Sequence, residues 1–136
     1  LMARGAQLVL KTVRSIAEKK YQSTPQPGSG NFKTAPKIFK ETCAINWNQE
    51  TRQIRNFVRG LNPRPTAWTT LNGKIYKIYK VTTAAWNENK KPGEFSTDNQ
   101  QHLYVKTSDG WISVEELQAE GKRKMGIQEF FRGNKL

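Results

Sequence analysis

Apolar side chains recur at helical spacing at the start of the chain. They stand three or four positions apart, at Met2, Ala6, Val9, Val13 and Ile16. This spacing places them on one face of a helix, so residues 1–20 are expected to form an amphipathic helix. Residues 21–36 then lose the hydrophobic period and are dominated by Pro, Gly, Ser, Thr and Gln, which is typical of a mobile linker.

A second helical pattern precedes a proline-rich turn. Its apolar residues stand at i, i+3, i+4 and i+7, at Ile54, Phe57, Val58 and Leu61. The pattern predicts a helix of about three turns with Phe57 in the core. Asn48 is a candidate N-cap, and Pro63 prevents the helix from continuing beyond Asn62.

From residue 67 to residue 117 the pattern changes to short strands separated by turn signals. Asn72-Gly73 favours a type I′ hairpin, and Asp109-Gly110 marks a second tight connection. About five strands are expected, and a small antiparallel barrel or sandwich is their natural closure. The ending "IQEFF" predicts a short helix held by Phe130 or Phe131. Residues 37–136 are therefore expected to form one mainly β domain with short helices, an α+β fold.

The charge of the chain points to a polyanionic partner. Lys and Arg number 23 and Asp and Glu 11, which gives a formal net charge of +12 and a pI near 10.0. For 136 residues this excess favours nucleic acid first and an acidic membrane surface second.

Three basic groups are candidates for contacting such a partner. Arg52, Arg55 and Arg59 fall on the helical face opposite the apolar residues, and Arg64 lies between two prolines beside the same helix end. Guanidinium groups suit phosphate oxygens, which they meet with two hydrogen bonds. A solvated face of a basic protein is an equally good explanation of this pattern.

The second group is Lys74, Lys77 and Lys80, interleaved with tyrosines as on many nucleic-acid-binding barrels. Their spacing of three cannot keep all of them on one face of a strand without a bulge, and protection of a sheet edge is the competing explanation. The third group is Lys122, Arg123 and Lys124, an exposed loop cluster that is expected to contact phosphate.

Tryptophans offer a second kind of contact, because indole rings stack on unpaired bases. Trp68 and Trp111 border strands and are expected in the core. Trp86 lies in a polar loop and is the best exposed candidate.

Catalytic chemistry has little support in the sequence. His102 has no carboxylate or nucleophile at a known motif spacing, and Cys43 is expected to be a buried thiol. One cysteine excludes an internal disulfide and a cysteine zinc site, which indicates a reduced, cytosolic protein without a metal. The apolar run "AQLVL" is too short to span a bilayer, so no membrane segment is expected.

Several motifs resemble the C-terminal part of the methionyl-tRNA formyltransferase family. They follow in order as "GAQLVLKTV", "APKIFKETCAINW", "IRNFVRGLNPRPTAW", "GKIYKIYK", "KTSDGWISVEELQAEGKRKM" and "IQEFFRGNKL". The Asn-Pro-x-Pro-x-x-Trp turn from Asn62 to Trp68 and the run from Leu117 to Met125 are the most specific. Two residues depart from the family pattern: Asn46 stands where an aspartate is usual, and Arg64 where an aromatic residue is common.

The resemblance implies an OB-fold-like barrel that helps to hold initiator methionyl-tRNA. It also implies that residues 1–20 are the last helix of a missing N-terminal catalytic domain, which would bind 10-formyltetrahydrofolate. This fragment is expected to bind no cofactor and to be inactive alone. Two alternatives remain: a related formyltransferase acting on a nucleotide sugar or on folate, and a structural module that binds no RNA. The net charge disfavours the first of these.

Overall fold

The computed structural model describes residues 2–25, 28, 30 and 32–136. Contacts divide the chain into two units, Leu1–Ala35 and Pro36–Leu136. The first unit contains helix α1 (Met2–Ala17), as its hydrophobic period predicts. The described residues between α1 and Lys40 contain no further helix or strand, and residues 26, 27, 29 and 31 of the expected linker lie outside the described residues.

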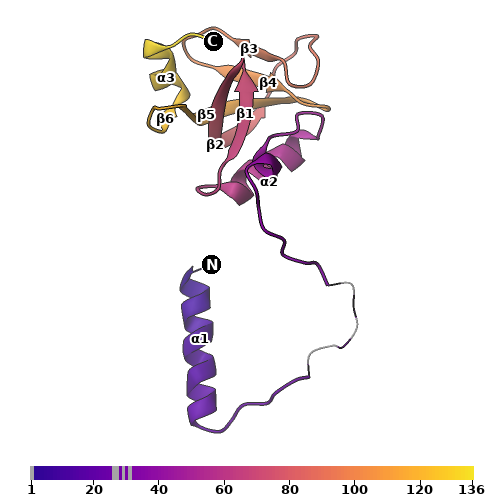
Figure 1. Ribbon diagram of the computed structural model, residues 1–136, viewed down its shortest axis with the longest axis vertical. Helices are drawn as coiled ribbons and strands as arrows, with labels where there is room; N and C mark the ends of the chain where they lie inside the picture. Colours follow the sequence, from indigo (N-terminus) through magenta and orange to yellow (C-terminus); the bar gives the residue numbers. More distant parts are fainter. Residues whose placement is uncertain (1, 26–27, 29, 31) are drawn as a thin grey trace. The chain divides into compact units, whose positions relative to one another are not determined.

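The second unit holds the remaining elements (Figure 1). Its helical elements are the 3-10 turn η1 (Glu41–Cys43), α2 (Thr51–Leu61) and α3 (Ile127–Gly133). Its strands are β1 (Ala67–Leu71), β2 (Lys74–Ala84), β3 (Phe95–Thr97), β4 (Leu103–Lys106), β5 (Trp111–Ala119) and β6 (Met125–Gly126). The five expected strands and the terminal helix are all present, and β6 is an addition.

The strands form one antiparallel sheet in the order β1-β2-β5-β4-β3. The short strand β6 pairs with β5 at Glu116 and Leu117. Figure 1 shows that the sheet curls, with α2 and α3 at different ends of it. The prediction of a mainly β, barrel-like domain with short helices is confirmed. The finer assignment to the OB-fold stays a prediction. The expected hairpin turn is also present, because Asn72 and Gly73 have φ values of 46° and 76°, both positive as a type I′ turn requires.

Strand β2 is irregular at its centre. Its register with β5 shifts between Ile78 and Lys80 and again between Lys80 and Val81. Because of this bulge, the strand buries Tyr76, Ile78 and Val81 instead of strictly alternate residues. The alternation of inward and outward side chains is therefore shifted by one residue halfway along β2.

The core lies in the hollow of the curled sheet and is closed by the two helices. Its largest fully buried side chains come mainly from η1, α2, β2, β4, β5 and α3 and include Cys43, Ile54, Val58, Ile78, Leu103, Ile112, Leu117 and Phe130. Phe130 of α3 meets Tyr76 of β2 edge to face, with ring centroids 5.8 Å apart. The expectations of a buried Cys43 thiol and of a terminal helix held by Phe130 and Phe131 are confirmed.

Helix α2 begins at Thr51, so the expectation that Asn48 is the N-cap is wrong. The N-cap is Glu50, whose N–H donates to the side chain of Gln53. The carboxylate of Asp109, in the loop before β5, accepts the Thr51 N–H at 2.7 Å and the Thr51 hydroxyl at 2.8 Å. A residue 58 positions away thus accepts hydrogen bonds from the first turn of the helix. Local sequence patterns cannot reveal such a contact.

Two aromatic residues are less buried than their positions suggest. Phe57 is half-buried against the core and not inside it, because its ring lies at the border of the apolar face of α2. Trp68 is likewise half-buried, and its indole N–H donates to the Lys40 carbonyl at 2.8 Å. Trp111 is buried at 3 % exposure, as expected.

This difference yields a stability prediction for α2. Ile54 is fully buried, so replacing it by Ala should lower the free energy of unfolding by about 2 to 5 kcal/mol through lost burial and a cavity. Phe57→Ala should cost less, because part of the ring already contacts water. Urea denaturation of the two variants would check this order, and a larger loss for Phe57→Ala would contradict the placement of the two side chains.

Candidate nucleic-acid interface

The arginine stripe of α2 is presented to solvent. Thr51, Ile54, Val58 and Leu61 are the buried residues of the helix, whereas Arg52, Arg55 and Arg59 are all exposed. Among the described residues, none of these three arginines has a carboxylate within ion-pair distance. At 1.5 Å rise per residue, the stripe is about 10 Å long. Its guanidinium groups are therefore available to an external anion.

Arg64 is exposed in the turn that follows the helix, and the backbone of this turn is held from inside. Both proline bonds of the turn, at Pro63 and Pro65, are cis. Thr66 has a φ of 78°, an unfavourable region for a β-branched residue. Its N–H donates to the Leu61 carbonyl at 3.0 Å and its hydroxyl to the Pro63 carbonyl at 2.5 Å. These bonds fix the position of Arg64 beside the C-terminal end of α2.

The lysines of β2 are all exposed, and the bulge determines on which face of the sheet each of them lies. Lys77 pairs in register with Trp68 on one side and Gln118 on the other, on the outer face of the sheet. Lys80 stands at the bulge, opposite Glu116. Lys74 lies at the hairpin end of the strand. The bulge therefore leaves both Lys77 and Lys80 outside, as the lysine spacing required.

Tyr79 connects the second and third basic groups. Its hydroxyl donates to the Gln118 side chain at 2.8 Å, and the Gln118 amide donates to the Lys122 carbonyl at 2.6 Å. The Lys124 ammonium lies 5.4 Å from the centroid of the Tyr79 ring, a cation–π distance. The Asn62 side chain at the end of α2 also donates to the Tyr79 carbonyl at 3.1 Å. The helix end, the middle of β2 and the basic loop are therefore neighbours.

Carboxylates occupy part of the third group. Arg123 forms an ion pair with Glu129, and Lys124 forms one with Glu116 at 2.8 Å. Both pairs are solvent-exposed, so each contributes about 1 kcal/mol or less and exchanges readily for another anion. Within the described residues, Lys122 is the member of this group without such a partner.

A groove of about 440 Å³ runs between β1, β2 and the turn after β5. Its lining includes the ammonium-bearing side chains of Lys40 and Lys77 and the apolar surfaces of Trp68 and Ile75. The end of β5 at Gln118 and Ala119 and the turn residues Glu120 and Gly121 complete it. Sequence patterns did not select Lys40 because it precedes the folded elements. The only signal in the sequence that could have indicated Lys40 is the presence of a second lysine, Lys37, three positions before it.

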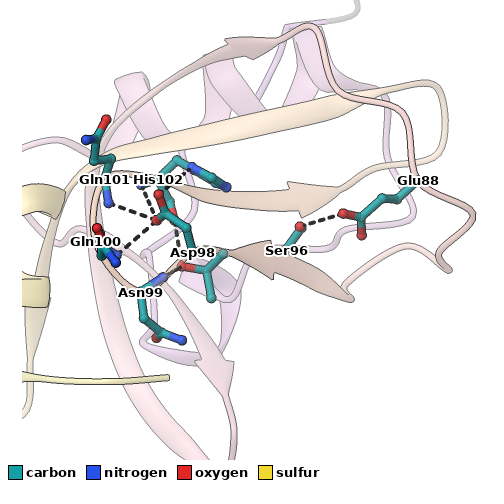
Figure 2. A network of polar contacts seen from close by, with 8 residues as sticks. Glu88, Ser96, Asp98, Asn99, Gln100, Gln101 and His102 are labelled. Carbon is teal, nitrogen blue, oxygen red and sulfur yellow. Dashed lines mark hydrogen bonds and ion pairs between the residues drawn. The ribbon is translucent and has the colours of Figure 1, made fainter.

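A network of polar contacts orders the loop between β3 and β4 (Figure 2). The Asp98 carboxylate accepts the backbone N–H groups of Gln100, Gln101 and His102 at 2.8 to 3.1 Å. These donors, that of Gln101 foremost, lower the pKa of Asp98 to about 2. Asp98 also lies 3.2 Å from Nδ1 of His102. The sequence "DNQQH" carries the signal for such an Asx turn, which was not among the sequence-based predictions.

The described residues offer neither a membrane-spanning helix nor a cluster of metal ligands. No helix in the parts of the chain that the structure describes is long and apolar enough to cross a bilayer. Among the same residues, no three His, Cys, Asp or Glu side chains gather as metal ligands would.

Fold and surface together define a barrel-like domain with an extended basic outer face. Residues 37–135 match the family described as formyl transferase, C-terminal domain, and the chain belongs to this family. It is 40 % identical over 144 residues to the methionyl-tRNA formyltransferase of Parabacteroides distasonis, which covers 99 % of this chain and 44 % of the relative. The methionyl-tRNA formyltransferase of Chlorobium phaeovibrioides is 43 % identical over 132 residues, covering 95 % and 41 %. The chain thus spans less than half the length of these relatives, and its resemblance to their C-terminal part is confirmed.

Solved structures share the fold at greater distance. A HypX variant from Aquifex aeolicus superposes with a TM-score of 0.66 and 20 % sequence identity, covering 90 % of this chain and 22 % of that one. HypX in complex with tetrahydrofolic acid gives a TM-score of 0.65, also at 20 % identity. At this level of identity the likeness concerns the fold alone.

The Asp98 network predicts a pH-dependent contribution to stability. Because the pKa of Asp98 falls from 3.8 to about 2 on folding, its contribution is complete above pH 3.8 and is lost as the pH falls towards 2. The difference in Tm between the wild type and Asp98→Asn should be constant near neutral pH and vanish towards pH 2. Thermal unfolding followed by circular dichroism measures it, and a difference that grows on acidification would contradict the network.

Proposed function

We propose that residues 37–136 form the tRNA-binding domain of a methionyl-tRNA formyltransferase and hold initiator methionyl-tRNA for N-formylation in translation initiation. The observation that carries the proposal is the continuity of the basic groups from α2 across β2 to the 122–124 loop, through the contacts of Tyr79. Family membership adds the expected partner, because its relatives are named methionyl-tRNA formyltransferases.

Recognition by this face is electrostatic and directed at the sugar-phosphate backbone. Arginine and lysine side chains on an exposed convex surface can approach phosphates of a folded RNA, whereas they offer few hydrogen-bond patterns that would read a base edge. The domain therefore positions the tRNA, and the choice of initiator tRNA is made elsewhere in the enzyme. About five neutralised phosphates correspond to a slope of log K against log salt of roughly −3.5 to −4.5.

The catalytic step belongs to an N-terminal domain that precedes these residues in the full enzyme. We assign residues 1–20 to its last helix, residues 21–36 to the linker, and 10-formyltetrahydrofolate to its active site. The 136-residue chain alone should bind tRNA without transferring a formyl group. The enzyme would act in the cytoplasm, where initiator tRNA is formylated. A nucleotide-sugar formyltransferase is the less favoured parent, because its small substrate does not call for a net charge of +12.

The arginine stripe provides the main test. Replacing Arg55 or Arg59 by Ala should weaken tRNA binding and reduce the salt slope by about one unit per lost contact. Both side chains are exposed, so stability should change by no more than about 0.5 kcal/mol. Arg132→Ala is the matched control, because it removes the same charge from the exposed surface of α3, outside the stripe. Fluorescence titrations with tRNA at several salt concentrations measure the slope.

The opposite outcome is equally clear. Arginine variants that melt early while binding tRNA normally would make the stripe structural, and the binding surface would then move to Lys122, Arg123 and Lys124. Equal losses for Arg55→Ala and Arg132→Ala would indicate a response to net charge without a defined interface. A salt response that is flat for the native chain would refute the electrostatic proposal as a whole.

Helix α1 should lack a packing partner in the isolated chain. It carries an apolar stripe at Val9, Val13 and Ile16 but buries none of its own side chains, so the stripe needs a partner. We expect weak protection from hydrogen exchange or concentration-dependent association in sedimentation experiments. A well-protected α1 in a strict monomer would argue against its assignment to a separate catalytic domain.

A further inference from the structure

Three aromatic rings gather on the outer face of the sheet, away from the core. Tyr104 lies on β4 between the buried Leu103 and Val105, so its side chain points outward. The His102 ring stacks on it at 4.5 Å with an interplanar angle of 17°. Trp86, from the loop after β2, completes the group at 5.1 Å from Tyr104 and 5.5 Å from His102.

Packing alone does not account for this aromatic cluster. Trp86 remains 38 % exposed, although burying an indole is strongly favourable. The cluster covers the hydrophilic outer side of the sheet, where Tyr104 pairs in register with Ser96 and Ser113. The Trp86 ring, tilted by about 46° to the stacked pair of Tyr104 and His102, is therefore left partly in contact with water.

Two polar networks hold the rings in place before any ligand binds. His102 is oriented by Asp98, whose carboxylate is itself fixed by backbone N–H groups (Figure 2). The loop that carries Trp86 is tied down at Glu88, which accepts from the Ser96 hydroxyl at 2.8 Å and pairs with Lys90 at 3.0 Å. An ordered ring surface of this kind binds a planar ligand at little entropic cost.

We propose that Trp86, His102 and Tyr104 form a stacking platform for an unpaired nucleobase of the bound RNA. This inference rests on the proposed RNA-binding function and adds a single-stranded subsite to a face that otherwise meets phosphates. Base–aromatic stacking tolerates any sequence, because every base has a π-face. His102 also supplies a polar atom beside the rings, because it meets Asp98 through Nδ1 and its Nε2 lies on the other side of the imidazole.

The charges around the platform suit a nucleotide better than a cationic ligand. The carboxylates that hold the cluster are already engaged, Asp98 by backbone donors and Glu88 by Lys90 and Ser96. A third carboxylate, that of Glu115, accepts from the Thr82 hydroxyl at 2.9 Å. Lys80 lies on the same outer face: Tyr104 pairs with Ser113, and Ser113 pairs with Thr82, two residues from Lys80. Two strand spacings across the sheet and two residues along β2 amount to about 12 Å between Cα atoms, so a single RNA strand can reach both the platform and the lysine.

The test compares a single-stranded 12-mer RNA with a duplex of the same length, titrated at fixed salt against the 136-residue chain. Trp86→Leu keeps an apolar side chain but removes the ring. It should weaken binding of the single strand roughly 5- to 150-fold, the fold-change of one lost stacked base, and leave duplex binding within about twofold. Trp86→Phe keeps a ring, and should lose less. Arg59→Ala is the control and should weaken both RNAs.

Tryptophan fluorescence provides a readout that does not depend on a destabilising variant. Trp47 and Trp111 are buried, and Trp68 is half-buried, so quenching by a stacked base should come mainly from Trp86. Single-stranded RNA should quench the native chain and quench Trp86→Phe much less. Equal quenching in the two proteins would overturn the platform.

The remaining outcomes separate the two proposals. If tRNA binding depends on Arg59 while Trp86→Leu changes neither RNA, the platform is wrong and the proposed function stands. Equal losses for single strand and duplex in Trp86→Leu would assign the cluster to packing, and no binding of the single strand beside normal duplex binding would also refute it. If the native chain binds neither RNA nor tRNA, both proposals fail.

Discussion

Strand β2 pairs with both β1 and β5 while it buries apolar side chains on one face and exposes lysines on the other. The bulge at Lys80 makes this combination possible. With strict alternation, a strand that buries Tyr76 and Ile78 would point the side chain at position 81 outward. The extra residue returns Val81 to the core and keeps the lysines outside. The same irregularity bends the strand, which lets β1 and β5 follow a curled surface around the core. Both the closed core and the basic outer face follow from this one adjustment.

A second constraint fixes helix α2 on that frame. The Asp109 carboxylate accepts from the Thr51 N–H and from the hydroxyls of Thr51 and Thr107, and these bonds lower its pKa. The start of the helix is thus bonded to the loop before β5, while Asn62 bonds its end to β2. Because the helix is fixed at both ends, the orientation of its arginines is set by the sheet. The backbone positions from which the basic side chains project are therefore fixed relative to one another.

Local patterns predicted the elements well because periodicity, prolines and turn dipeptides act over a few residues. The helix at Ile54 to Leu61, the Asn72-Gly73 turn and the terminal helix follow from such signals. Long-range bonds were beyond their reach, so Asn48 was mistaken for the cap that Asp109 and Glu50 supply together. The basic residues were found by type and spacing. Their union through Tyr79 and Gln118 required the fold, because it depends on which strands are neighbours.

The ion pairs of the basic loop have a consequence for selectivity between anions. Arg123 and Lys124 are already neutralised by Glu129 and Glu116, so an incoming ligand must replace a carboxylate before it gains either cation. A lone phosphate or a weakly charged metabolite gains little from that exchange. A polymer that presents several phosphates at once offsets the loss through its many simultaneous contacts. Because each exposed pair is worth about 1 kcal/mol or less, the internal carboxylates would weaken the binding of a single small anion only modestly, and a ligand with many phosphates would be the least affected.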